Sequence, residues 1–588
     1  MNMAEFNTDY SNPMDRPYHT GHASGVGQAK PEIEGPIITI GELGQTVPET
    51  DPSGKFKNMV QGVQAALRAG SKNIQLVLTV PPNSPMGGRP KAYGQEVRQA
   101  MKELFVANQA NLIGIEMPTS MNNLSGFDPQ QGVFSETTRE KYTDEVKEAI
   151  RLASDIGQGG GIDIVSWEFQ RPISAIAAER EGFAPEKDEI RQVVEADTGR
   201  IIPFRVQKVE RDMPFEPGTE TETGIDENGF PKMKKWKWDD FVAWAELKSK
   251  QEGKEITPEE LVVKSQFDAQ VKVAEGYAKH YMGQAVEIEK AMKAAKEAGD
   301  TVRAKDLEIR FQSDRQLAIG QMQQADEAKR KMENILPVSK YAKEKSMESY
   351  AELGIAAMDE TLNNPRVKSP IHVGPELGWP HAYGGHPKEF VELIKGARAK
   401  MAEKLETDRG MNSSEAKRQA EEHIQGMLDT GHLGMWLEHF KPTMRYTDRL
   451  KEFNKWFMGQ IDYLAGEKVI GGIQAVDSAG AAHGHLPPGQ GIFPVVDAVR
   501  RLKEKGFKGY IVSEGHEEER FGEGRILLKT WQSFNAPIES RYGPGVHKQS
   551  YDPRHQGYFG RVQSPRQMFG SYTPPFGEYK PWSEIPFE

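Results

Sequence analysis

The chain has 588 residues, with 75 Lys and Arg against 86 Asp and Glu, a formal charge of -11 and no cysteine. The absence of cysteine excludes disulfides, thiolate zinc sites, iron–sulfur clusters and cysteine nucleophiles. The acidic charge argues against duplex nucleic acid or an anionic membrane as the principal partner.

The first 34 residues are polar and contain no cationic and apolar sequence of the secretory type. The apolar runs, such as 74–80, have the length of a strand and fall far short of the roughly 20 residues in a membrane helix. We therefore expect a soluble, cytoplasmic protein without a membrane partner.

Eight short β-branched apolar runs, each followed by a polar or Gly/Pro turn, predict buried parallel strands. These runs lie at 36–44, 73–81, 111–118, 161–171, 369–378, 423–430, 469–477 and 509–514. Helical periodicity follows them at 55–69, 92–108, 138–155, 387–405, 433–464, 494–505 and 517–534. This alternation predicts an α/β fold, a (β/α)8 TIM barrel, with a doubly wound open sheet as the alternative.

The remaining segments suggest how the chain is divided. We expect an N-terminal arm at 1–34, two barrel halves at 35–172 and 369–537, a mostly helical insertion at 173–368, and an aromatic, Pro-rich C-terminal arm at 538–588. The insertion separates strands four and five. Residues 35–172 and 369–515, which carry the eight predicted strands, number 285 and so come close to the usual size of this barrel, about 250 residues.

The insertion contains a predicted helical hairpin, with 265–298 packed against 301–335. Its apolar residues are sufficient for one buried stripe: Val271, Val273, Tyr277, Met282, Val286, Ile288 and Met292. With the aromatic C-terminal arm, this hairpin predicts a homo-oligomer. A solvated helical spacer remains the alternative reading.

Acidic, amide and imidazole side chains follow six of the predicted strands. In chain order they are Glu116, Glu168, Glu376, Asp429, His432, Gln474, Asp477, His483, His485, Glu514 and His516. The carboxyl ends of barrel strands meet at one mouth, so these groups are expected to converge there. Carboxylates brought together repel one another without a cation, and this predicts a divalent metal site.

The oxygen-rich donor set favours Mn2+ or Mg2+, with Zn2+ or Co2+ as further possibilities. A single acid after a strand is more often a solvated loop residue or a helix cap, so Glu116 and Glu168 are weak indications taken alone. We expect both, with His483 and His485, to bind substrate. His372, within strand five, is expected to be a core or supporting group.

The second half of the barrel resembles the xylose-isomerase-like barrel superfamily of sugar isomerases, sugar epimerases and endonuclease IV-like enzymes. The resemblance rests on Glu376, the motif Asp429-Thr-Gly-His432, the loop 483–491 and Glu514. It implies that Glu376 and Glu514 are metal ligands and the acid/base pair. It also implies that Asp429 is a ligand and that His432 contacts the substrate at the catalytic centre.

Strand seven departs from the family pattern. Gln474 stands where a metal-binding histidine is expected, unless Asp477 or His483 takes that role, and the usual arginine of the following loop is missing. The resemblance therefore implies either an altered metal site or lost activity.

The predicted function is a divalent-metal-dependent sugar or sugar-phosphate isomerase or epimerase, acting by proton transfer through a metal-bound enediolate on a small sugar-like substrate. One alternative is an oligomer-forming barrel with weakened or lost catalysis. A second is an endonuclease IV-like phosphodiester hydrolase, but the ends of strands two and three offer no histidine for its metal cluster. Nucleic acid is therefore not expected as a partner.

Overall fold

The computed structural model describes residues 36–49, 58–79, 89–121, 123–176, 181–184, 186–227, 229, 231–515 and 525–536. The predicted arms at 1–34 and 538–588, together with His516, lie outside these ranges. Among the described residues, no helix has both the length and the apolar character needed to cross a membrane.

Eight parallel strands close into a barrel, which confirms the predicted fold. Around the barrel the strands follow chain order, and β6 pairs directly with β12 across the large insertion. The strands are β1 (Leu43–Pro48), β2 (Asn73–Val77), β3 (Asn111–Glu116), β6 (Gly160–Val165), β12 (Ile371–Glu376), β13 (Gly426–Asp429), β14 (Ile470–Gln474) and β15 (Tyr510–Ser513).

The first strand lies later in the chain than predicted. The expected run at 36–44 overlaps β1 by only two residues, because β1 spans Leu43–Pro48. The apolar residues before it instead lie beside the last helix, where the N–H of Ile37 donates to the carbonyl of Phe534 at 3.0 Å. Pairing with β2 and β15 selects the strand, and this long-range pairing is not visible in local β-propensity.

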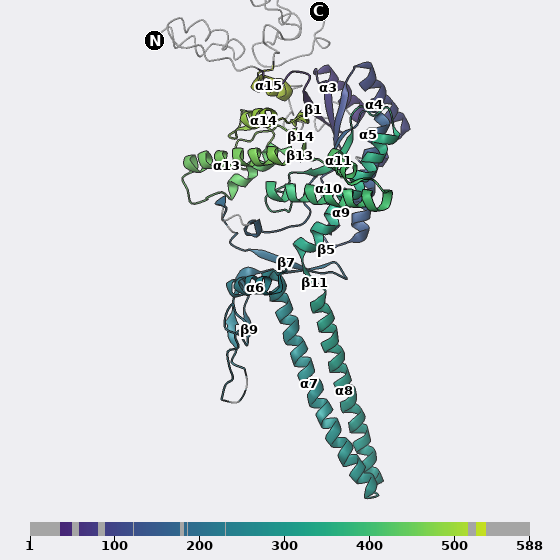
Figure 1. The fold of residues 1–588 in the computed structure, drawn as a ribbon, viewed down its shortest axis with the longest axis vertical. Helices are drawn as coiled ribbons and strands as arrows, with labels where there is room; N and C mark the ends of the chain where they lie inside the picture. Colours follow the sequence, from purple (N-terminus) through teal and green to yellow (C-terminus); the bar gives the residue numbers. More distant parts are fainter. Residues whose placement is uncertain are drawn as a thin grey trace, which may run out of the picture.

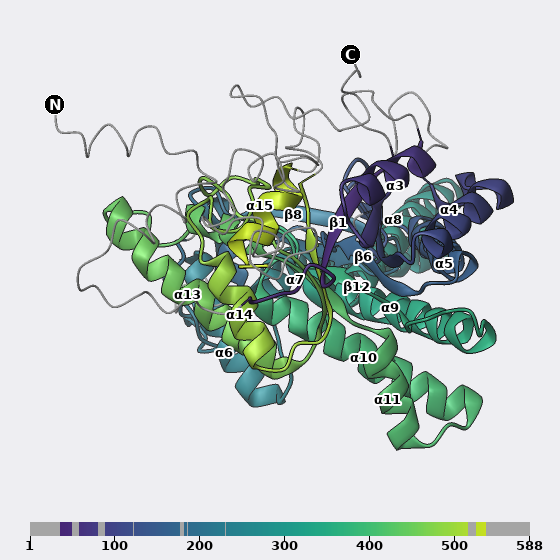
Figure 2. The ribbon, with the colours of Figure 1, turned by 90° about the horizontal axis from the view of Figure 1, so that it is seen from above.

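Helices cover the outside of the barrel (Figure 2). They are α3 (Met59–Arg68), α4 (Gln95–Ala107), α5 (Glu136–Ile156), α9 (Val338–Asn363), α10 (Pro387–Arg409), α11 (Ser413–His423), α13 (Tyr446–Glu467), α14 (Val495–Glu504) and α15 (Arg525–Ser533). α9 packs against both α5 and α10, so the last helix before β12 is a helix of the barrel wall.

The single helix predicted at 433–464 is wrong. The chain forms a short helix α12 (Thr430–Gly434), a 3-10 turn η5 (Met435–Glu438) and then α13, separated by a loop. Pro442 lies in that loop and has no N–H for a helical hydrogen bond. The residue before it, Lys441, has a left-handed backbone with φ 39°, which no α-helix accommodates.

The chain between β6 and α9 extends away from the barrel (Figure 1). It contributes β7 (Ile190–Glu195), β8 (Arg200–Arg205) and β11 (Ile335–Pro337) to a five-stranded sheet, whose other two strands, β4 (Phe127–Asp128) and β5 (Val133–Phe134), lie between β3 and α5 in the chain. It also contains a pair of strands, β9 (Arg211–Met213) and β10 (Lys234–Trp236). After α6 (Trp238–Glu252), the long helices α7 (Pro258–Glu297) and α8 (Thr301–Glu333) pack as an antiparallel hairpin that projects from the barrel (Figure 1).

The seam of this hairpin is made of small residues. Buried alanines line it on both helices: Ala274, Ala278, Ala285, Ala295, Ala304, Ala318, Ala325 and Ala328. Val271 is buried as expected, but Val273, Tyr277, Met282 and Val286 are exposed, so the predicted apolar stripe is wrong for these four. Close approach of two helices requires small side chains between them, and the larger residues are left on the outside.

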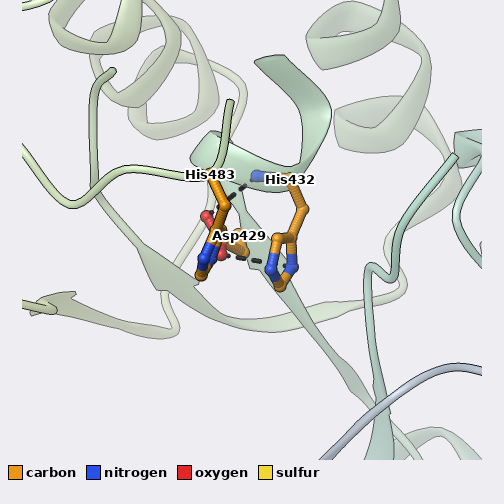
Figure 3. Close-up of side chains that lie close together, drawn as sticks. All are labelled: Asp429, His432 and His483. Atoms are coloured by element: carbon orange, nitrogen blue, oxygen red, sulfur yellow. Dashed lines mark hydrogen bonds and ion pairs between the residues drawn. The ribbon is translucent and has the colours of Figure 1, made fainter. Parts of the chain in front are cut away.

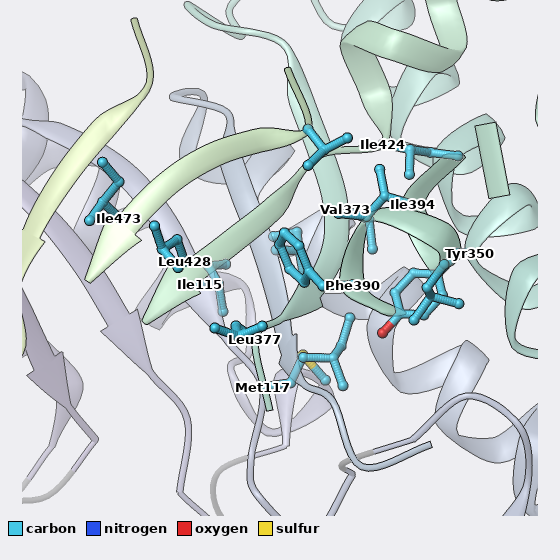
Figure 4. Close-up of a cluster of buried hydrophobic side chains, with 14 of the residues drawn as sticks. Ile115, Met117, Tyr350, Val373, Leu377, Phe390, Ile394, Ile424, Leu428 and Ile473 are labelled. Atoms are coloured by element: carbon cyan, nitrogen blue, oxygen red, sulfur yellow. The ribbon is translucent and has the colours of Figure 1, made fainter. Parts of the chain in front are cut away.

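The main core lies between the strands and the covering helices (Figure 4). Phe390 and Ile394 of α10 pack over β13, where a Cβ on Gly426 would lie 2.4 Å from the ring of Phe390. Tyr350 of α9 is fully buried in the same cluster. Burial of each such side chain contributes about 1.5–3 kcal/mol, so this layer holds the strand ends in place.

Glycines in the strands make room for two large side chains inside the barrel. A Cβ on Gly161 would lie 2.3 Å from the hydroxyl of Tyr510 and 2.7 Å from Nε2 of His372. Burial lowers the pKa of His372 to about 4, so this imidazole is neutral at pH 7. His372 is therefore a core group, in agreement with expectation.

Gly161→Ala is expected to destabilise the chain by about 1–3 kcal/mol, because the added methyl group overpacks the barrel interior. Gly283→Ala is the matched control: Gly283 is exposed on α7, and its Cβ would meet nothing within 4 Å. That control should gain about 0.5–1 kcal/mol, since alanine favours the helix. Urea unfolding of both variants measures the difference, and equal effects would contradict the packing argument.

Candidate active site

Five side chains predicted for the site come from the carboxyl ends of neighbouring strands. Glu116, Glu376, Asp429 and Gln474 are the last residues of β3, β12, β13 and β14, and Glu514 follows β15 directly. All five are buried. The amide Nε2 of Gln474 donates to Oε2 of Glu116 at 3.1 Å. The barrel therefore directs these groups to one end of its interior, as the strand order requires.

His432 lies at the centre of this group and is held on all sides. Its Nδ1 donates to the carbonyl of Leu377 at 2.7 Å and lies 3.1 Å from Oε1 of Glu376 and 3.2 Å from Oδ2 of Asp429. Its Nε2 accepts from the indole N–H of Trp379 at 3.1 Å. These contacts place a proton on Nδ1 and fix the ring between two carboxylates.

Asp429 owes its position to the start of α12. Its Oδ1 accepts from the backbone N–H groups of Gly431, at 2.6 Å, and His432, at 3.3 Å. A carboxylate at a helix N-terminus satisfies donors that have no partner within the helix. The motif Asp-Thr-Gly-His thus contains both the last residue of β13 and the first residues of α12. This arrangement directs the carboxylate of Asp429 and the imidazole of His432 toward the mouth of the barrel.

The loop after β14 brings two more imidazoles to the mouth, and Figure 3 shows one of them, His483, beside His432. The ring of His483 stacks on that of His432, with centroids 4.7 Å apart and planes at 22°. His485 lies 4.4 Å from His483 between ring centroids, and its Nε2 is 3.7 Å from Oε2 of Glu514. Ligand atoms of Asp429, His432 and His483 all lie within 4.8 Å of one another, a spacing that fits a metal ion.

Asp477, which the sequence offered as a metal ligand of strand seven, has a structural role instead. Its Oδ1 accepts from the N–H groups of Ser478, at 2.8 Å, and Phe493, at 3.1 Å. Its Oδ2 accepts from those of Gly489, at 3.1 Å, and Gly491, at 3.0 Å. Four backbone donors occupy this carboxylate, so Asp477 fixes the shape of the histidine loop and is not available as the strand-seven ligand.

Glu168 is not part of the group at the mouth. Its carboxylate accepts from the backbone N–H groups of Leu124 and Ser125, at 2.9 and 3.0 Å, and from the hydroxyl of Ser346 at 2.6 Å and that of Tyr350 at 3.3 Å. It is fully buried. The predicted substrate contact by Glu168 is therefore replaced by a structural one, which ties the loop after β3 to α9.

A third carboxylate, Asp163, joins Glu116 and Glu376 inside the barrel and was missed by the sequence analysis. One oxygen of each lies within 4.8 Å of the others. Burial, and then the neighbouring carboxylates, raises the pKa of each of the three well above its ordinary value. The available signal was an acid in the middle of the apolar run Gly161-Ile-Asp-Ile-Val165, where a solvated loop residue has no place.

A known protein family matches part of the second half of this chain. The family described as Xylose isomerase-like TIM barrel matches residues 412–531. This part of the chain is similar to the xylose isomerase-like TIM barrel family. The matched residues include the Asp429 motif, Gln474, the histidine loop and Glu514, and the family contains sugar isomerases and endonuclease IV-like enzymes. No curated protein matches the chain.

Members of this xylose isomerase-like family often bind divalent metals, and the donors at the mouth fit such an ion. Oε2 of Glu376 and Oε1 of Gln474 are buried and have no hydrogen-bond partner among the described residues. Buried polar atoms are normally satisfied, so oxygens left open beside Asp429 and the imidazoles are suited to a metal ion. Carboxylate, amide and imidazole ligands together agree with Mn2+ or Mg2+ and do not exclude Zn2+ or Co2+.

The raised pKa values of the buried acids make the free energy of unfolding of the cation-free protein depend on pH. Glu116, Asp163 and Glu376 keep protons in the folded chain that the unfolded chain releases above about pH 4. Stability in EDTA should therefore fall as the pH rises from 5 to 8, and the fall should shrink in excess Mn2+. Urea unfolding at each pH measures this, and stability in EDTA that rises over the same range would contradict it.

Proposed function

We propose that this chain is a divalent-metal-dependent isomerase or epimerase of a small sugar or sugar phosphate. The observation that carries the proposal is the convergence of Glu376, Asp429, Gln474 and Glu514 with His432, His483 and His485 at one barrel mouth. Metal-assisted isomerisation next to a carbonyl needs a cation, a base and an acid around one carbon, and this set contains ligands for a cation together with carboxyl groups for the other two roles.

The four strand-end residues Glu376, Asp429, Gln474 and Glu514 are the proposed metal ligands. A divalent ion bound there would polarise a substrate carbonyl and so make the neighbouring C–H more acidic. Glu376 is the proposed base, because its carboxylate ends β12 at the mouth, with Oε1 3.1 Å from Nδ1 of His432. Glu514, beside His485, returns a proton to the substrate, and His432 orients the reacting oxygens.

Aromatic side chains at the rim support a sugar-like substrate. The indole rings of Trp167 and Trp379 lie 5.1 Å apart between centroids, and Trp379 also contacts His432 and His483. Aromatic walls with a few convergent polar groups are typical of small-molecule sites. Trp379 is partly exposed, so it can cover the apolar face of a sugar ring and exclude water from the carboxylates.

The net charge of the chain and the residue at the end of the third barrel strand argue against the endonuclease activity found in the xylose isomerase-like family. Glu116 occupies the end of β3, where the three-metal nuclease cluster requires a histidine. A net charge of -11 also repels a phosphodiester backbone. Small polar substrates do not need a positive surface, so the isomerase proposal is compatible with both observations.

Self-association is a second proposal, compatible with the first. The hairpin α7/α8 exposes large apolar side chains, among them Val273, Tyr277, Met282, Ile309 and Met322. Large exposed apolar side chains gathered on one element often mark an interface, and we propose a second copy of the chain as the partner. Light scattering of the purified protein tests this, and a monomer at all concentrations would reject it.

Solvent exchange tests the isomerase proposal without knowledge of the substrate. The protein loaded with Mn2+ or Mg2+ is incubated in D2O with a panel of aldoses, ketoses and their phosphates, and NMR follows deuterium at the carbon next to the carbonyl. Exchange and a new epimer or isomer are expected for at least one sugar, and both should stop in EDTA. A metal-loaded, folded protein that exchanges no proton in the panel would contradict the proposal.

A further inference from the structure

One side of the helical hairpin carries a stripe of side chains that is apolar at its centre and charged at both ends. On α7 these side chains fall into two series with a period of seven residues, which is two helical turns, so they share one side of the helix. None of them is buried. They are Asp268, Lys272, Met282, Val286, Glu289 and Lys293.

α8 continues this stripe on the same side of the hairpin. Nζ of Lys329 donates to Oε1 of Glu275 at 2.7 Å and so joins the two helices there. Met322 lies seven residues before Lys329, and Met282 lies seven residues after Glu275. Because the helices are antiparallel, both methionines lie two turns further toward the tip of the hairpin, on the same side. Ile319 is three residues from Met322, and all three apolar side chains are exposed.

The charges of the α7 stripe are complementary to the same stripe in reverse. Along the helix the order is acid, base, apolar centre, acid, base. Asp268 and Lys293 are equally far from a midpoint between residues 280 and 281, and so are Lys272 and Glu289. A second α7 that runs in the opposite direction therefore places each acid opposite a base. A parallel copy would place like charges opposite each other.

The α8 part of the stripe gives the same axis independently. Arg315 and Asp326 flank the apolar pair Ile319 and Met322, each at a distance of four residues. A reversed copy of α8 thus places Arg315 opposite Asp326 and the apolar pair over itself. The midpoint lies between residues 320 and 321, which is level with the α7 midpoint to within about one turn.

We infer that a second copy of this chain packs on this stripe about a two-fold axis, so that two hairpins form an antiparallel four-helix bundle with the barrels at opposite ends. The hairpin projects clear of the barrel (Figure 1). Strand β9 contacts α7 at Gln266, on the side away from Asp268. From Asp268 to Lys293 the contact is about 40 Å long. This inference rests on the self-association proposed above and is independent of the isomerase activity.

A charge exchange tests the stripe at constant composition. In the half exchange, Asp268→Lys with Lys272→Glu, both new charges face like charges of the second copy, so the dissociation constant should rise at least about 10-fold. The full exchange adds Glu289→Lys with Lys293→Glu. Every pair is then complementary again, and the dissociation constant should return close to that of wild type. Sedimentation equilibrium measures the constants, and far-ultraviolet circular dichroism checks that the helix content is unchanged.

Met282→Asp tests the apolar centre, with Ile309→Asp as its matched control. Both residues are exposed apolar positions within the hairpin helices. Ile309 is nine residues, or two and a half turns, from the buried Ala318, so it lies on the outer side of α8. Met282→Asp should therefore weaken association at least about 10-fold, because it buries a charge without a partner. Ile309→Asp should associate like wild type.

The possible results separate this surface from self-association in general. A half exchange that associates as tightly as wild type would overturn the surface and leave self-association through another one. A full exchange that stays as weak as the half exchange would overturn the antiparallel arrangement. A wild type that is monomeric at all concentrations would reject both the surface and self-association. The isomerase proposal is unaffected by each of these results.

Discussion

Glu376→Gln is expected to lower the rate of proton exchange by about 10²- to 10⁴-fold, the contribution of a positioned general base. The substitution keeps the size of the side chain and removes its ability to take a proton. The rate is measured with whichever sugar exchanges in the wild type. Metal content is counted on the same samples, because Glu376 is also a proposed ligand.

Glu438→Gln is the matched control for this experiment. Glu438 is an exposed acid in η5, six residues after His432, and it makes the same change of charge near the mouth. Its exchange rate and metal content should equal those of wild type. Glu376→Gln with the wild-type rate would remove Glu376 from the chemistry, whatever happens to the metal.

Arg171→Met should produce the largest loss of stability, about 3–5 kcal/mol, because it leaves a buried carboxylate without its partner. Arg171 forms a double ion pair with Glu389, with two N–O distances of 2.6 Å, and also donates to the carbonyl of Pro380. These contacts join the loop after β6 to the first turn of α10 and to the loop before it. The free energy of unfolding from urea titration measures the loss.

Arg418→Met serves as the control for the ion-pair prediction. Arg418 also contacts two acids, Glu415 and Glu422, but its side chain is 57% exposed, so water replaces the lost contacts. Its unfolding curve should overlay that of wild type. If Arg171→Met does the same, the pair with Glu389 does not stabilise the fold. A drop in exchange rate beyond the unfolded fraction would show that the two loops also position Trp379.

The barrel was accessible from the sequence because parallel strands buried on both faces have a local signature. Seven of the eight strands lie within their predicted ranges or one residue outside them. The first strand was misplaced, since two apolar runs compete there and only pairing selects one. The broken helix before α13 was missed although Pro442 marked it, because the apolar periodicity continues on both sides.

The candidate site also contains residues that the sequence predicts and residues whose roles depend on tertiary contacts. Glu116, Glu376, Asp429, Gln474 and Glu514 could be predicted, because a strand end in this fold always faces the mouth. The tasks of Asp477 and Glu168 could not be, since each depends on which backbone N–H groups the folded chain brings to it. Sequence position suggests a metal ligand for Asp477 and a substrate contact for Glu168, whereas their hydrogen bonds show that both carboxylates stabilise the fold.

The sequence by itself determined the chemistry available to this protein: no thiolate, a barrel fold, and oxygen and imidazole groups at the strand ends. The tertiary structure decided which of these groups meet. Asp163 shows the reason, because its side chain points into the barrel and reaches Glu116 and Glu376 only through strand register. Local sequence patterns indicate where a strand lies and which side chains alternate along it. The distance between charges on different strands is set by the register of the closed barrel.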